Sequence, residues 1–178
     1  MKKQSGFTLV ELIIVIVIIS ILVAFALARF VDLQQEARIA TVEQVAGVMK
    51  SQSAIIHSVA LTNGITDGSV TIDGNEVSVK GSYIEGHWNI AWFYALDVGK
   101  VISFTAVASE CTGNDLCGVG NQNGNNSVYS ALPISTGGVT GLVTIWLKGD
   151  KISDNCYAYF FNAEDGSDPV IGSVTSGC

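Results

Sequence analysis

An uncharged apolar run near the N-terminus limits what this chain can fold into. Residues 12–28 carry no charge, and their one polar side chain is Ser20. With the apolar residues just before it, the run approaches the roughly 20 residues that cross a bilayer. A single carboxylate, Glu11, stands at its N-terminal end. An ionisable group inside a membrane-spanning segment is costly, so we expect Glu11 to have a functional partner.

Two simpler interpretations explain this segment less well. A secretory signal peptide has an apolar core of about 7–15 residues with its cleavage site beyond it, whereas here the run is longer and Gly6 precedes it. A plain membrane anchor fits the length but gives no reason for Glu11 or for the glycine.

Lys2 and Lys3 should hold the N-terminus in the cytoplasm. The chain after Ala28 is then expected outside the cytoplasm.

The composition agrees with one exported acidic domain. The chain has 178 residues, enough for one domain with a real core and too few for two comfortable ones. Its formal charge is −7, and loss of residues 1–6 would remove two of its nine basic groups and none of its 16 acidic groups. Nucleic acid is a poor partner for such a chain, because phosphate binding needs clustered Lys and Arg.

Four cysteines lie in the second half of the chain, where an exported protein forms disulfides. They are Cys111, Cys117, Cys156 and Cys178. Four cysteines allow three connectivities. We expect the first two to pair around a small Gly/Asn-rich loop, and the last two to tie the C-terminal residue to a strand. The second bridge should contribute about 3 kcal/mol by the chain-entropy estimate. A zinc site is disfavoured, because no Cys-x-x-Cys pair occurs and both histidines lie far upstream.

Beyond the apolar run the helix is expected to continue. An apolar stripe recurs at steps of three and four residues, as one face of an amphipathic helix requires. The stripe comprises Ile39, Val42, Ala46, Met49, Ser53, Ile56 and Ala60, widened by Val45, Val48, Ile55 and Val59. A polar face repeats every seven residues through Glu36, Glu43, Lys50 and His57. Because Asn63-Gly64 is a plausible stop, we predict a helix from about Phe7 to Thr62.

The sequence after this helix predicts mainly β structure. Residues 70–72 and 77–79 flank Asp73-Gly74-Asn75 and predict a hairpin. An amphipathic helix is expected where Trp88, Ala91, Trp92, Ala95 and Leu96 recur at helical spacing. Strands are expected at 100–107, 127–132, 140–147 and 156–161, which are rich in β-branched and aromatic residues. The Gly/Asn-rich stretch 113–126 is expected to be a surface loop.

These features resemble type IV pilins of the type IVa prepilin class. The leader, the long helix and the C-terminal cysteine pair carry the resemblance, and residues 30–34 with Ala37-Arg38 are similar to the mannose-sensitive haemagglutinin branch. The resemblance implies an α+β fold, a long N-terminal helix with a membrane-spanning first half packed on a C-terminal antiparallel β-sheet domain. It implies a leader at 1–6, a transmembrane and filament-core helix at 7–28, and a globular domain at 29–178 that includes the second half of the helix.

The resemblance also implies a processing route. In this family a prepilin peptidase cuts after the glycine and methylates the new N-terminus, which corresponds here to cleavage after Gly6 and N-methylation of Phe7. The family's glutamate corresponds to Glu11. Members usually carry a glycine and a proline at the positions of Ser20 and Ala28, and this chain has neither. We therefore predict a continuous helix through this segment in the free subunit. In the filament we expect the segment to stay helical more often than in proline-containing relatives.

Elementary electrostatics suggests how the subunits assemble. The free α-amino group of Phe7 on one subunit is a cation at the membrane depth of Glu11 on another. Opposite charges about 4 Å apart attract by about 4 kcal/mol at an effective dielectric of 20, before desolvation is subtracted. Such a pair can set the axial step between subunits, while apolar burial holds the helices together. A heterologous contact of this kind that does not close produces a helical homo-oligomeric filament.

Catalysis finds little support in the sequence. His57 and His87 lack a nucleophile or carboxylate at a diagnostic spacing, so both are expected to be surface or packing residues. The acidic residues Asp150, Asp154, Asp165 and Asp168 match no known calcium loop. The aromatic residues Trp88, Trp92, Phe93 and Tyr94 could line a sugar-binding groove, but their helical spacing favours core packing. We predict no enzyme activity, no metal and no cofactor.

Two functions remain. The first is a structural subunit of an extracellular type IV pilus that mediates surface attachment. The alternative is a pseudopilin of a type II secretion filament. The pilus is favoured because the disulfides and loop-rich C-terminal half suit an exposed fibre. Its expected partners are further copies of the chain, the prepilin peptidase, the pilus assembly machinery and, before assembly, the inner membrane. The expected final location is a pilus on a Gram-negative cell surface.

Overall fold

One long helix dominates the first third of the chain. The computed structural model describes residues 8–178, without the side chain of Ala28. Helix α1 runs unbroken over Leu9–Asn63, close to the predicted limits. Its interior contains no proline, and Ser20 donates its hydroxyl to the Ile16 carbonyl at 2.6 Å, one turn earlier. The helix ends at Asn63, and the next residue, Gly64, has a φ of +66°, which suits a residue without Cβ.

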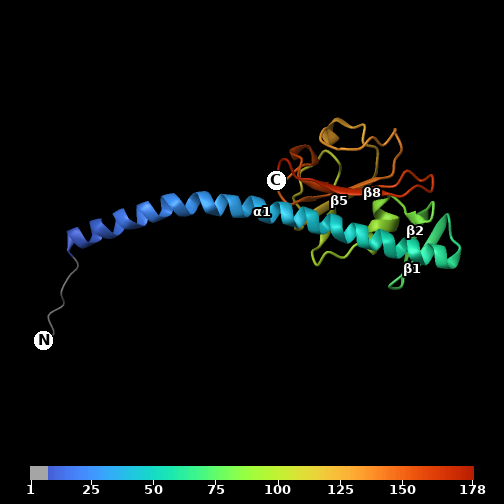
Figure 1. Cartoon of the computed structure of the whole chain (residues 1–178), viewed down its shortest axis with the longest axis horizontal. Helices are drawn as coiled ribbons and strands as arrows, with labels where there is room; N and C mark the ends of the chain where they lie inside the picture. Colours follow the sequence, from blue (N-terminus) through green and yellow to red (C-terminus); the bar gives the residue numbers. More distant parts are fainter. Residues whose placement is uncertain (1–7) are drawn as a thin grey trace. The chain divides into compact units, whose positions relative to one another are not determined.

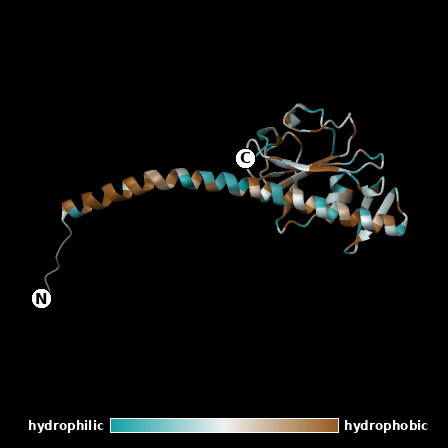
Figure 2. Cartoon of the chain, in the orientation of Figure 1, coloured by the Kyte–Doolittle hydropathy of each residue, from teal (hydrophilic) through white to brown (hydrophobic). Residues whose placement is uncertain are grey.

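The chain divides into two compact units, residues 1–37 and residues 38–178. In the first unit the helical side chains described from Leu9 to Leu33 are exposed. Most of these residues are apolar, and the first turns of α1 are mainly coloured as hydrophobic in Figure 2. A stretch of 18 residues in α1 is strongly apolar, and none of its residues is buried inside the structure. By length and composition this helix can therefore cross a membrane.

The second unit contains two sheets (Figure 1). Its strands are β1 (Gly68–Ile72), β2 (Asn75–Lys80), β3 (Tyr83–Ile84), β4 (Ile102–Phe104), β5 (Leu116–Gln122), β6 (Leu142–Leu147), β7 (Tyr157–Phe161) and β8 (Val170–Val174). The first three form an antiparallel sheet, and the other five form a sheet in the order β4-β5-β6-β7-β8. The expected antiparallel sheet has one exception, because β4 pairs with β5 in parallel.

The predicted hairpin between β1 and β2 is confirmed. Ile72 pairs with Asn75 across a two-residue turn. The turn residues Asp73 and Gly74 both have positive φ, 49° and 81°, as a tight hairpin turn with the strand's own twist requires. Aspartate and glycine are among the residues that enter this region at least cost.

The five-stranded sheet buries both faces. On β6, Val143 and Ile145 lie in the core beneath α1, while Leu142 and Trp146 lie in a second core on the opposite face. The first core includes the expected α1 stripe, with Val42, Val45, Met49, Ile56 and Ala60 all buried. Ile55 departs from the expectation, since it is 49% exposed. The second core is covered by residues of the loops on either side of β5.

Three local predictions were wrong. Residues 127–132 form no strand; η2 (Ser127–Tyr129) is a short 3-10 helix whose N-cap, Asn126, accepts a hydrogen bond from the Val128 amide. The strand expected at 100–107 is limited to β4. The segment 113–126 is not wholly a loop, because it contains β5, the second strand of the larger sheet. Strands β3 and β8 were not predicted.

Packing against Trp88 explains why β5 is glycine-rich. A Cβ added to Gly118 would lie 2.5 Å from the Trp88 ring, and one added to Gly120 would lie 2.4 Å from the Trp88 amide nitrogen. The two glycines therefore let η1 (Trp88–Trp92) lie directly on the strand. Composition alone suggests a loop here, whereas the close approach of another element is the actual reason for the glycines.

The predicted helix at 88–96 forms as a π-helical turn, η1, followed by α2 (Phe93–Ala95). Trp88 and Trp92 are 2% and 0% exposed, as core packing predicts, and Trp92 contacts Phe160 edge to face. Phe93 and Tyr94 depart from that prediction. They are 57% and 46% exposed and pair with each other at the surface.

Candidate functional site

The N-terminal turn of α1 places Glu11 in a capping box with Thr8. The Thr8 amide and hydroxyl both donate to Glu11 Oε2, at 2.9 and 3.0 Å. The Glu11 amide in turn lies 3.3 Å from the Thr8 hydroxyl oxygen. This reciprocal arrangement satisfies donors that a helix start leaves without partners. Glu11 is therefore hydrogen-bonded within its own subunit, and both bonds end on the same carboxylate oxygen.

The capping box is a feature that the sequence reasoning missed. Thr8-Leu9-Val10-Glu11 matches the Thr-x-x-Glu signature that precedes an apolar helix. Gly6 and Phe7, the predicted cleavage and methylation positions, lie outside the described residues.

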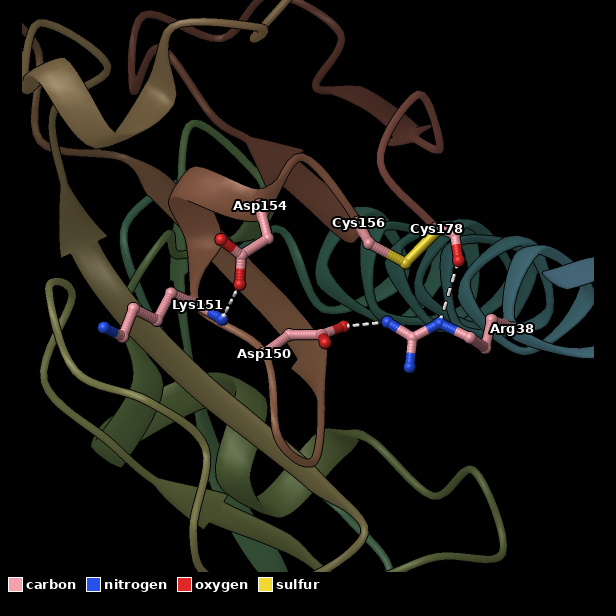
Figure 3. Close-up of polar contacts among 6 residues, drawn as sticks. All are labelled: Arg38, Asp150, Lys151, Asp154, Cys156 and Cys178. Atoms are coloured by element: carbon pink, nitrogen blue, oxygen red, sulfur yellow. Dashed lines mark hydrogen bonds and ion pairs between the residues drawn. A yellow bond between two sulfur atoms is a disulfide. The ribbon is translucent and has the colours of Figure 1, made fainter. Parts of the chain in front are cut away.

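A second polar cluster lies where α1 enters the second unit. Arg38 Nε donates to the Cys178 backbone oxygen at 3.0 Å, and Arg38 Nη2 pairs with Asp150. Figure 3 shows the guanidinium between these two partners and the Cys156–Cys178 disulfide beside it. Arg38 thus ties α1 to the turn between β6 and the short 3-10 helix η3 (Ile152–Asp154), and to the C-terminal segment. Charge-assisted hydrogen bonds of this kind are among the stronger polar contacts in proteins.

Both expected disulfides are present. Cys111 pairs with Cys117, and Cys156 pairs with Cys178. The first lies in the second core, between the loop after β4 and strand β5. The second joins the start of β7 to the residue that Arg38 contacts. Sequence spacing suggested the pairing, while the contact with Arg38 required the tertiary structure.

The other candidate residues have packing or surface roles. His57 stacks on Tyr83 with ring centroids 3.8 Å apart, and its Nδ1 lies 2.8 Å from the Ser82 carbonyl oxygen. Asp168 accepts a hydrogen bond from the Tyr83 hydroxyl, and this bond raises the pKa of Tyr83. Asp154 accepts from the Lys151 amide, and Asp165 accepts from the Ser167 amide. Hydrogen bonding by the Ser167 side chain and by its amide lowers the pKa of Asp165. Within residues 8–178 no three metal-ligating side chains gather.

Comparison with known proteins first identifies the family that the N-terminal segment matches. Residues 1–27 match the family described as the prokaryotic N-terminal methylation motif. The chain is also similar to the type IV narrow pilus major component PilA5 of Thermus thermophilus. The two are 55% identical over 53 residues, which make up 30% of this chain and 46% of the relative. The match thus spans about half of the relative's length. No solved structure matches the chain significantly.

These comparisons support a type IV pilin-like chain. The methylation motif contains Gly6, Phe7 and Glu11, and the structure has the pilin-like combination of a long apolar helix and a β domain. The named relative is a pilus component, which agrees with the expectation that the chain is not an enzyme. Neither match supports the mannose-sensitive haemagglutinin branch in particular.

Proposed function

We propose that this chain is the structural subunit of an extracellular type IV pilus that mediates surface attachment on a Gram-negative cell. One observation carries the proposal: an exposed apolar helix of membrane-spanning length begins with a single carboxylate, Glu11, inside a methylation motif. The pilus relative supports a pilus over a secretion pseudopilin. The similarity of residues 30–34 to the mannose-sensitive haemagglutinin branch extends the proposal to that branch.

The proposed pathway begins in the inner membrane. A prepilin peptidase removes residues 1–6 after Gly6 and methylates Phe7, leaving a charged amine. Residues 7–28 then form the membrane span and later the filament core, and residues 29–178 form the exposed domain. The assembly machinery brings the Phe7 amine of one subunit to Glu11 of another. Because Thr8 occupies Oε2, we expect the amine to approach Oε1.

The decisive variant is Glu11→Gln. Glutamine can still accept the Thr8 hydrogen bonds, so the capping box survives while the charge is lost. Membrane insertion should be intact or slightly easier, because an intramembrane charge has been removed. Assembly should fail, with subunits accumulating in the inner membrane. Cell fractionation and electron microscopy measure both results, and Glu11→Ala is the companion that also removes the cap. Normal fibres from the Gln variant would exclude ion pairing as the registration device.

The cellular role needs a separate comparison. Cells with and without this chain should differ in long surface fibres and in attachment to surfaces. Fibres that persist without the chain would contradict the pilus assignment. Loss of protein secretion with no change in surface fibres would favour the pseudopilin.

A further inference from the structure

A groove of about 660 Å³ runs between α1 and strand β8. Its apolar surface comes largely from Ala54, Pro169, Val170 and Ile171. Val170 is 43% exposed, although it lies in a strand. Because β8 is an edge strand of the five-stranded sheet, this groove opens at one edge of the domain. We call it the β8 groove.

Polar residues brace one wall of the β8 groove. His57 of α1 stacks on Tyr83, and the Tyr83 hydroxyl donates to Asp168. These contacts tie three separate chain segments together around the opening. Asp168 remains exposed and places a carboxylate at the rim. The groove is therefore a built surface with an apolar floor, and its lining carries one acid, Asp168, and one base, Lys50.

The opposite edge of the same sheet carries a complementary surface. Strand β4 is the other edge strand, and Val101 and Phe104 are 65% and 60% exposed there. Lys100 is also exposed and immediately precedes them. We call residues 100–104 the β4 ridge. Four strand spacings of about 4.8 Å separate the two edges, so ridge and groove of one chain lie about 19 Å apart.

We propose that the β8 groove receives the β4 ridge of a second copy of this chain. The proposal rests on the proposed filament, for which it names a contact between globular domains. Copies that have lost residues 1–6 keep seven basic and 16 acidic groups, so they carry a formal charge of −9 and repel one another. Their contact therefore needs apolar area and correctly placed opposite charges. Ridge and groove supply both, because Val101 and Phe104 meet an apolar floor and Lys100 meets Asp168. Since the surfaces lie on opposite edges, the contact is heterologous and can repeat without closing.

Cysteine cross-linking tests this contact directly. All four native cysteines are paired, so an added cysteine is the free thiol that a maleimide modifies. The double variant Val101→Cys/Val170→Cys, treated as filaments with a short bis-maleimide, should give a ladder of covalent multimers. An intramolecular link is too long for such a reagent. Each single variant should give no ladder. Val101→Cys/Ser130→Cys is the matched control, because Ser130 is exposed but lies in a loop outside the groove.

The outcomes distinguish failure of the ridge–groove contact from failure of the proposed filament. Filaments that form normally but give no ladder, or give one equally with Ser130→Cys, would overturn the contact and leave the proposed function intact. Equal maleimide labelling of Val170→Cys in filaments and in detergent-solubilised subunits would show an open groove and overturn it as well. Absence of filaments from the parent chain would refute the proposed function.

An exchange of the two proposed partner charges tests the same contact without added cysteines. Lys100→Asp should lower the fraction of subunits in filaments by severalfold, because it places an acid opposite Asp168. Adding Asp168→Lys in the same chain should restore that fraction, since the pair is then reversed. Lys148→Asp, an exposed change outside the ridge, is the control for net charge. Failure of the second substitution to restore assembly would overturn the contact.

Discussion

Among single residues, Thr8 and Glu11 combine a local role with the proposed assembly role. The local role follows from four consecutive residues, since a Thr-x-x-Glu signature before an apolar run predicts a capping box. The assembly role depends on a charge that another chain must supply. Arg38 is different, because its partners Asp150 and Cys178 are distant in sequence. No local pattern could identify those contacts.

Tyr157 carries a buried hydroxyl without a hydrogen-bond partner among the described residues. Its ring lies in the second core near Tyr129, whose hydroxyl contacts Thr144. An unsatisfied buried polar group costs about 1–3 kcal/mol. We expect Tyr157→Phe to leave the free energy of unfolding at pH 7 unchanged or about 1 kcal/mol higher. Urea unfolding of the purified chain in detergent measures this, and a loss above 1 kcal/mol would indicate a partner for the hydroxyl.

The same tyrosines predict a loss of stability in alkali. Burial raises the pKa of Tyr129 to about 12 and also raises that of Tyr157, against an ordinary value of 10.0. Above pH 10 the unfolded chain therefore releases protons that the folded chain retains, and stability falls as pH rises. Each group contributes a slope of up to about 1.4 kcal/mol per pH unit. Tyr157→Phe should flatten this decline in the same urea experiment, and an unchanged slope would contradict the assignment.

Substitutions of two glycines separate the effect of packing between elements from the effect of helix propensity. Gly118→Ala should destabilise the domain by about 1–3 kcal/mol, because the new methyl meets the Trp88 ring. Gly47→Ala is the matched control, since it lies inside α1 with no atom within 4 Å of the added methyl. That change should be neutral or should stabilise the helix by up to about 1 kcal/mol. Thermal unfolding followed by circular dichroism compares them, and equal effects would refute the packing explanation.

The continuity of α1 carries a prediction for the filament. The structure confirms an unbroken helix from Ser20 to Ala28 in the single chain. Proline costs about 3 kcal/mol and glycine about 1 kcal/mol relative to alanine in a helix interior, and this segment contains neither. We therefore expect it to remain helical in the filament. A filament map at side-chain resolution decides the matter, and an extended backbone there would show that lattice packing overrides local propensity.

For the whole molecule, leader removal is the proposed step that creates the assembling species. Gly6→Leu should block cleavage, because a bulky side chain replaces the glycine at the peptidase site. The uncleaved chain keeps residues 1–6, so Phe7 never gains a free amine. Intact-mass measurement should show the leader still attached, and electron microscopy should show no filaments. Ser5→Ala is a control that leaves the glycine in place. A cleaved Gly6→Leu product with normal fibres would contradict this pathway.

The sequence by itself determined the parts of this protein that depend on local pattern. The apolar run and its helix follow from composition, the α1 stripe from its 3.6-residue period, and the β1–β2 hairpin from Asp73-Gly74. The tertiary structure decided the rest. Strand β5 contains glycines because Trp88 lies against it. Strand β4 pairs with β5 in parallel because the segment that joins them returns the chain to the end of the sheet at which β4 begins. The β4 ridge and the β8 groove lie on opposite edges of the sheet because of the strand order. Local propensity acts over a few residues, whereas strand order and close packing depend on residues far apart in the chain.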